Sequence, residues 1–318
     1  MKVSIDVGYS QVKAISETGK KILFPSVKTN DPTAGRFKTR IGHKVEIHSF
    51  RSKRYELVGE AAIQSQSATS TLSREKSIEM HDLFILTALY LCGASGINQI
   101  AVGLPLAFYR FQKDELKSRL EGLNAQIQVN DGEKRHISVS IANVYPQGAG
   151  VLLSDSLDVV KNGQLGLIDI GYYITNYLMF ELVDGLPYPI AELCGSVDLG
   201  IHLVAKAIAD FYQEKTGAIA PKFLLNDIII DKPIMFQGKR LGIMPISIYE
   251  RVAQQITQEV LTVWGKQADL VNQTILAGGG SILLKQFLPF TNTIIPADPV
   301  FANAEGFLLA LKSQQEAK

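Results

Sequence analysis

A five-residue pattern occurs twice in this chain and constrains its fold more than any other feature of the sequence. Ile5-Asp6-Val7-Gly8-Tyr9 returns as Ile168-Asp169-Ile170-Gly171-Tyr172, at an offset of 163 residues. In each copy, apolar and β-branched residues typical of a buried strand lead into a turn marked by glycine. The sequence therefore predicts two related halves, each beginning with a strand, a tight turn and a second strand.

Each copy also places one acidic residue, Asp6 or Asp169, inside a strand built for burial. A buried carboxylate is costly unless it meets a cation, hydrogen-bond donors or metal-bound water. One alternative is that each Asp caps its own turn through the following amides. The other is that the two carboxylates hold Mg²⁺ through water. The occurrence of two copies at equivalent places favours the second alternative.

The turns themselves have the composition of phosphate-binding loops. Glycine lets successive backbone N–H groups face one anion, and the hydroxyls of Ser10 and Thr175 add donors. Lys13, in the strand that leaves the first turn, can place an ammonium beside the same anion. Two such hairpins suit a nucleoside triphosphate, whereas the sequence has neither a GxxxxGK[ST] loop nor a GxGxxG turn after a strand.

Composition narrows the class of protein. The chain has 318 residues, 46% hydrophobic and 20% charged, as in ordinary globular proteins, and its formal net charge is +1. No chain-wide field therefore favours nucleic acid or anionic lipid. The longest apolar run, around residues 83–92, is too short to span a bilayer. Cys92 and Cys194 lie far apart in apolar surroundings, so we expect a cytoplasmic protein with two buried thiols and neither a disulfide nor a zinc site.

Positive charge is concentrated in residues 20–54, which contain ten Lys or Arg and two acids. One interpretation is a loop-rich subdomain whose charges face water. The other is a contact surface for a polyanion or an acidic neighbour.

Elsewhere the periodicity predicts alternating strands and helices, and hence α/β layers. The expected helices cover residues 78–92, 113–120, 151–157, 200–214 and 249–264 and the end of the chain from 302.

These motifs resemble, in order and spacing, those of the superfamily that contains actin, sugar kinases and the heat-shock chaperone ATPases. Within it, the sequence is most similar to the bacterial and archaeal actin-like proteins of the ParM/StbA type. Residues 6–13 and 169–175 resemble the first and second phosphate loops, and residues 145–150 the first connecting segment. Residues 277–281 resemble the adenosine motif and residues 301–306 the second connecting helix.

The resemblance implies an α/β fold of the actin-like (ribonuclease H-like) type, with two related α/β domains and a nucleotide cleft between them. Domain I would comprise residues 1–150 and 297–318, with a smaller subdomain at about 20–80, and domain II residues 151–296. Asp6 and Asp169 would orient Mg²⁺ and its waters, and Gln147 would position the water that attacks ATP or GTP. The residues implied to line the nucleotide are Gly8, Tyr9, Ser10, Lys13, Gly171, Tyr172, Tyr173, Thr175, Glu214, Lys215, Gly278, Gly279, Gly280 and Ser281.

Two of these assignments stay open at the level of sequence. Glu214 and Lys215 either reach the ribose or base or form a solvated helix end. Tyr172 and Tyr173 stand where relatives often have small residues, so they either shape the second loop and its hydrolysis rate or pack as ordinary strand residues.

The function implied by the resemblance is a Mg²⁺-dependent nucleoside triphosphatase that forms head-to-tail filaments and hydrolyses nucleotide in them. Its expected role is the segregation of plasmid DNA through a DNA-binding adaptor protein, without sequence-specific DNA contacts of its own and without a membrane. The alternatives are a small-molecule kinase or non-polymerising ATPase on the same fold, and a cytoskeletal scaffold without DNA cargo.

Overall fold

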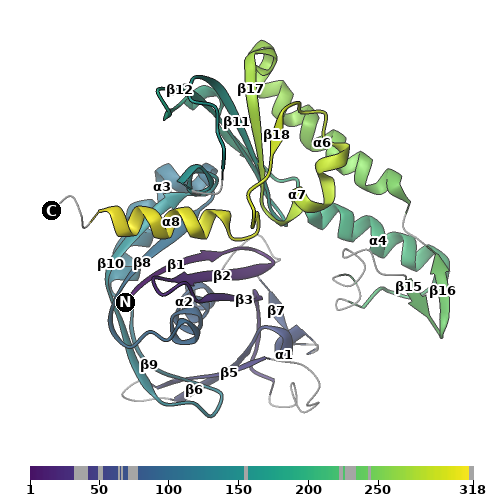
Figure 1. Cartoon of the computed structure of the whole chain (residues 1–318). Helices are drawn as coiled ribbons and strands as arrows, with labels where there is room; N and C mark the ends of the chain where they lie inside the picture. Colours follow the sequence, from purple (N-terminus) through teal and green to yellow (C-terminus); the bar gives the residue numbers. More distant parts are fainter. Residues whose placement is uncertain are drawn as a thin grey trace. The chain divides into compact units, whose positions relative to one another are not determined.

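The two copies of the repeated pattern begin two separate units of the chain. The computed structural model describes residues 1–31, 42–48, 53–63, 65, 67–70, 78–153, 157–221, 225, 234–242 and 245–314. Unit 1 comprises Met1–Ser156 and Val300–Lys318, and unit 2 comprises Leu157–Pro299. The last helix, α8 (Ala302–Ser313, yellow in Figure 1), therefore returns the chain to the unit in which it started.

Unit 1 is built on a mixed sheet in the order β3-β2-β1-β8-β10-β9-β5-β6-β4-β7. β1 pairs antiparallel with β2 and parallel with β8, and β8 pairs parallel with β10. The strands are β1 (Lys2–Val7), β2 (Gln11–Ser16), β3 (Lys21–Pro25), β4 (Val27–Thr29), β5 (His43–His48), β6 (Lys53–Val58), β7 (Thr69–Ser70), β8 (Gly96–Leu104), β9 (Asn124–Val129) and β10 (Arg135–Pro146). Besides α8, the helices are α1 (Glu60–Ile63), α2 (Ile78–Cys92), α3 (Leu106–Glu121) and the 3-10 helix η1 (Ala149–Leu153).

Helices cover both faces of the strands near β1, because successive strand residues point to opposite faces and both sets are apolar. In β8, Ile100 and Val102 belong to the buried cluster formed with α2, whereas Ala101 packs with Phe307 and Leu311 of α8. Helix α2 contacts β3 and β9, which are far apart in the sheet order, since the sheet curls around this helix (Figure 1). This explains why α2 is apolar on nearly every side.

Unit 2 repeats the central strand order of unit 1. Its sheet runs β13-β12-β11-β17-β18, with β11 antiparallel to β12 and parallel to β17, and β17 parallel to β18. The strands are β11 (Gly163–Ile170), β12 (Thr175–Val183), β13 (Leu186–Pro189), β14 (Gly195–Val197), β17 (Val271–Ala277) and β18 (Thr293–Ile294), with β15 (Ile234–Phe236) and β16 (Lys239–Gly242) as a separate hairpin. The helices are α4 (Ile201–Thr216), α6 (Ile246–Trp264), α7 (Gly279–Leu284) and the 3-10 helices η2 (Ala191–Leu193), η3 (Gly265–Leu270) and η4 (Lys285–Phe287).

The outer strand of this second sheet, β13, carries prolines at two alternate positions. Ile190 N, just beyond the strand, donates to Met179 O of β12 over 2.8 Å. Because N–H groups of successive strand residues point to opposite sides, the N–H positions of residues 187 and 189 face away from β12. Both residues are proline and have no N–H, so β13 offers no backbone donor at these two outward positions.

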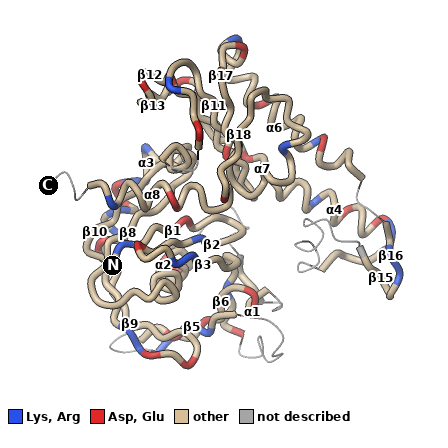
Figure 2. Tube along the Cα trace, viewed as in Figure 1, with Lys and Arg blue, Asp and Glu red and all other residues tan. Residues whose placement is uncertain are grey.

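The interpretation of residues 20–54 as a loop-rich segment is wrong for its described part. β3 to β6 are strands, and β5 joins the main sheet by pairing with β9. Several of its cations pair with acids: Lys44 and Lys53 lie 3.0 and 2.6 Å from the buried Glu46 carboxylate. Figure 2 shows basic and acidic residues interspersed around β5 and β6. Arg36, Lys38, Arg40 and Arg51 lie outside the described residues, and the contact surface stays a prediction.

Three further expectations need correction. The helix expected at residues 151–157 is the short 3-10 helix η1, which ends at Leu153; residues 154–156 lie outside the described part. Helix α3 begins at Leu106 and not at residue 113, because Pro105 occupies the N-cap position, where a missing N–H costs nothing. Cys92 is buried as expected, but Cys194 is only half-buried; both thiols are free. No helix in the described ranges combines the length and the apolar character needed to cross a bilayer.

Candidate functional site: two repeated turns

The first turn, between β1 and β2, is closed by one backbone hydrogen bond. Gly8 N donates to Gln11 O over 3.0 Å. A Cβ at Gly8 would lie 2.8 Å from Gln11 O and 3.4 Å from Nζ of Lys13. Only glycine therefore fits this turn without a shift of its backbone.

Asp6 lies at the end of β1 and receives a donor on each carboxylate oxygen. Nζ of Lys13 is 3.1 Å from Oδ2, and Nε2 of Gln147 donates to Oδ1 over 2.9 Å. The side chain of Asp6 is 6% exposed and that of Lys13 is 17% exposed. The register of the hairpin places these two residues opposite each other. The buried carboxylate thus has a cation and an amide as partners, which offsets the cost of its burial.

Ser26 holds the first turn from the other side. Its hydroxyl donates to Gly8 O over 2.7 Å, and its N–H donates to Ser10 O over 2.9 Å. In a trans peptide group, the N–H of one residue points away from the carbonyl of the residue before it. The N–H groups of Tyr9 and Gln11 therefore point away from Ser26. Sequence reasoning missed Ser26, because nothing in its own segment indicates that it returns to this turn.

Gln147 is fixed at a corner between β10 and η1. Its N–H donates to Leu104 O over 2.8 Å, and the next residue, Gly148, donates to Oδ1 of Asn303 in α8 over 2.8 Å. Helix α8 approaches so closely that a Cβ at Gly306 would clash with Gly150 O. The resemblance placed this corner and α8 among the family motifs, and the structure shows that they pack together within unit 1.

The second turn, between β11 and β12, repeats the first. Gly171 N donates to Ile174 O over 3.0 Å, and a Cβ at Gly171 would lie 2.7 Å from that oxygen. Thr175 does not offer its hydroxyl to the turn, because it is buried and donates to Leu199 O over 2.7 Å. Here the turn is backed by the start of α4, where a Cβ at Gly200 would lie 2.5 Å from Tyr172 O.

Asp169 occupies the place of Asp6, but its surroundings differ. The residue opposite it in the hairpin is Asn176, whose side-chain oxygen accepts a hydrogen bond from Ser196 over 2.8 Å. Unit 2 thus has an amide where unit 1 has Lys13. Gly278, at the end of β17, comes so close that a Cβ there would lie 2.5 Å from Oδ1 of Asp169.

The glycine run after β17 packs on the second turn. Gly278 has a φ of +78°, and a Cβ at Gly280 would lie 2.3 Å from Cγ2 of Ile170. Ser281 is buried and its hydroxyl donates to Gly278 O over 2.8 Å, at the start of the short helix α7. Gly279 has open space around its Cα. The run therefore brings backbone, and not side chains, to the surface beside Asp169.

Glu214 and Lys215 lie near the C-terminal end of α4, whereas the second turn packs on its N-terminal end. At 1.5 Å per residue, the 14 residues from Gly200 to Glu214 span about 20 Å. The two side chains are well exposed and pair with each other over 3.2 Å. A ligand that contacts both the turn and this pair must be extended along the helix.

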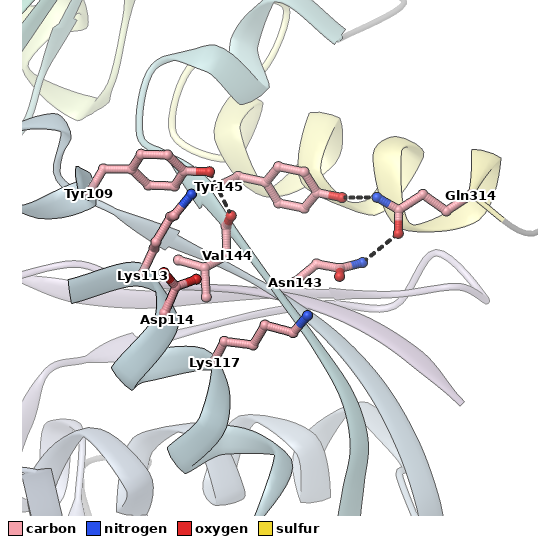
Figure 3. A pocket seen from close by; sticks show the side chains of 8 residues that line it. All are labelled: Tyr109, Lys113, Asp114, Lys117, Asn143, Val144, Tyr145 and Gln314. Atoms are coloured by element: carbon pink, nitrogen blue, oxygen red, sulfur yellow. Dashed lines mark hydrogen bonds between the residues drawn. The ribbon is translucent and has the colours of Figure 1, made fainter. Parts of the chain in front are cut away.

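A small cavity of about 210 Å³ lies elsewhere in unit 1, between α3, the end of β10 and Gln314. Figure 3 shows Tyr109 donating to Val144 O, and Gln314 bridging Asn143 and Tyr145. None of the residues predicted to contact nucleotide lines it.

Comparison with known proteins agrees with this doubled architecture. A family model described as the N-terminal domain of actin-like proteins matches residues 4–150, and one described as the C-terminal part of the archaeal MreB-like actin homologue matches residues 167–289. The two models match successive parts of the chain, and its fold is that of the actin-like proteins.

Similar proteins cover nearly the whole chain. The archaeal actin homolog of Thermoplasma acidophilum is 28% identical over 96% of this chain and 97% of its own length. The ParM of a 15-stranded filament from Clostridium botulinum is 26% identical, with a TM-score of 0.87 over 98% of this chain and 99% of that one. An archaeal actin homolog solved in complex with ADP is also 26% identical, with a TM-score of 0.82 and the same coverage.

Proposed function

We propose that this protein is a nucleoside triphosphatase whose copies assemble head-to-tail into filaments with ATP or GTP and Mg²⁺ bound, and come apart after hydrolysis. The observation that carries the proposal is the repeated turn: each has a glycine-closed hairpin and a buried Asp at the preceding strand end. The similarity to a ParM that forms a filament and to an actin homolog that binds ADP supports both parts of it.

The residues of the two turns suit the phosphate groups of such a nucleotide. Each turn directs backbone N–H groups away from the element that backs it, and Lys13 adds a positive charge in the first turn. Gly8, Tyr9, Ser10, Lys13, Gly171, Tyr172 and Tyr173 would bind the phosphates, and Gly278, Gly279 and Gly280 would lie against the nucleoside. Thr175 and Ser281 would act indirectly, because their hydroxyls are engaged with backbone carbonyls.

A hydrated Mg²⁺ fits these residues better than a directly bound one. Within the described ranges no group of three or more His, Cys, Asp or Glu side chains forms a metal-binding cluster. Asp6 and Asp169 would each accept hydrogen bonds from waters of the ion, which retains several waters in proteins. The ion would neutralise phosphate charge during transfer.

Gln147 would orient the attacking water. Its amide nitrogen donates to Asp6, so its amide oxygen is the atom that can accept a hydrogen bond from a water. An amide is not a strong base, so the contribution would come from positioning and electrostatics.

We also propose that the filament moves plasmid DNA through a DNA-binding adaptor, on the basis of the ParM/StbA-type motifs.

Light scattering with parallel phosphate release tests whether the protein assembles with nucleotide and comes apart after hydrolysis. The protein with Mg²⁺ and ATP should scatter light and lose the signal as phosphate appears; GTP and a slowly hydrolysed analogue define the nucleotide. Turnover without scattering at any concentration would favour a kinase or non-polymerising ATPase, and no nucleotide binding would overturn the proposal.

A further inference from the structure

The second turn is held by the first residues of α4. Ile201 N donates to Gly171 O over 3.2 Å, and His202 N donates to Tyr172 O over 2.8 Å. Nδ1 of the His202 ring also lies 3.0 Å from Tyr172 O. Because a carbonyl oxygen only accepts, the hydrogen of a neutral imidazole must be on Nδ1. Tyr172 O therefore receives two hydrogen bonds from one residue.

These contacts fix the direction of two N–H groups. The peptide bonds are trans, so each N–H points away from the carbonyl of the same peptide group. The carbonyls of Gly171 and Tyr172 point to α4, and the N–H groups of Tyr172 and Tyr173 therefore point away from it. A phosphate bound there meets donors that are already oriented.

The ring of His202 is also held in place. It stacks on Tyr173 at a centroid distance of 4.5 Å and an interplanar angle of 28°, and Tyr172 packs against Tyr173 edge-on at 5.2 Å. Burial lowers the pKa of His202, so the ring is neutral near pH 7. The two tyrosines, which are bulky for such a loop, thus form one cluster with His202.

We propose that His202 is a positioning residue of the second turn: its Nδ1–H holds the Tyr172 carbonyl so that the Tyr173 N–H faces a phosphate oxygen of the bound nucleotide. This rests on the proposed function of the turns. Ser26 does the same for the first turn, since its hydroxyl donates to Gly8 O. The two turns would therefore be backed by different side chains with the same task.

Two substitutions separate the hydrogen bond from the stacking. His202→Phe keeps a ring against Tyr173 but removes the donor, whereas His202→Asn keeps a side-chain N–H near the place of Nδ1 but removes the ring. Loss of one hydrogen bond should weaken Mg-ADP binding about five- to tenfold in His202→Phe. His202→Asn should stay within about twofold of the unmodified chain. Asp210→Asn, an exposed change on the same helix, is the control.

Adenosine provides a readout that a general folding defect would disturb. It has no phosphate, so its affinity should be equal in all four proteins, each of which should unfold cooperatively without ligand. The proposal would be overturned if His202→Phe bound Mg-ADP as tightly as the unmodified chain. It would also be overturned if His202→Asn lost as much Mg-ADP affinity as His202→Phe. If the unmodified chain binds Mg-ADP no more tightly than adenosine, the proposed function and this inference are both wrong.

A second measurement uses only the unmodified chain, so it does not depend on whether the His202 variants fold. The ¹⁵N spectrum of the imidazoles in the unmodified chain should show the His202 ring neutral and protonated on Nδ1. Its signal should shift when Mg-ADP is added and stay unchanged with adenosine. A neutral His202 protonated on Nε2 would contradict the inference.

Discussion

The amide nitrogen of Gln147 donates to Oδ1 of Asp6 over 2.9 Å, although the two residues are 141 positions apart in the sequence. Nζ of Lys13 lies 3.1 Å from the other carboxylate oxygen. One buried acid thus orients both the amide that would direct water and the cation that would meet phosphate. Changes at these residues should therefore separate hydrolysis from binding.

Gln147→Ala should slow phosphate release about tenfold or more, because an attacking water without its acceptor is misplaced. Affinity for Mg-ATP should change little, and filaments should persist longer. Phosphate release and sedimentation check both points. Gln314→Ala, at an exposed amide in the same unit, is the control, and a normal rate for Gln147→Ala would remove the residue from this role.

Lys13→Met should weaken Mg-ATP binding about tenfold or more, because it removes a partly buried ammonium from the first turn and leaves Asp6 without its cation. Lys117→Met, on the exposed face of α3, should bind as the unmodified chain does. Titration of each variant with Mg-ATP measures this. Equal affinities for the two variants would mean that Lys13 serves the fold alone.

Gly306→Ala should destabilise unit 1 strongly, by about 3 kcal/mol or more, because its Cβ would clash with backbone of Gly150 that no side-chain rotation can move. Gly122→Ala, whose Cβ would meet its nearest atom at 3.5 Å, should be nearly neutral. Denaturant unfolding compares the two. Similar stabilities would show that α8 can move away from η1 at little cost.

The buried thiol of Cys92 should lower the free energy of unfolding at alkaline pH. Burial raises its pKa to about 12, against 9.0 for a free thiol. The unfolded state therefore loses this proton first, and stability present below pH 9.0 falls as pH rises toward about 12, by at most about 1.4 kcal/mol per pH unit. Thermal unfolding at several pH values should show a shallower fall for Cys92→Ala. Parallel curves for both proteins would contradict the assignment.

Local signals in the sequence predict the strand pairs β1–β2 and β11–β12 and the helix α2. The hairpins follow from glycine turns between apolar runs, and α2 from an apolar run that matches its observed bounds. The pairing of Asp6 with Lys13 was also within reach, because the turn alone sets the hairpin register. What remains a prediction is the role of these residues toward nucleotide.

Contacts between distant segments could not be predicted in this way. β5 is charged and its neighbours in sequence suggest a loop, yet it pairs with β9, about 80 residues later. Asn303 reaches Gly148 across 155 positions, and His202 meets Tyr172 only because α4 packs on the turn. In each case the tertiary packing supplies the partner, and no spacing within one segment encodes it.

The two prolines of β13 have a consequence for any contact between copies of the chain. Strand addition needs N–H donors along the free edge, and residues 187 and 189 provide none. Copies that meet at β13 must therefore associate through side-chain surfaces, without merging their sheets into one continuous ladder. Such contacts break without unfolding either copy, so an assembly made of them can turn over, unlike an amyloid fibre.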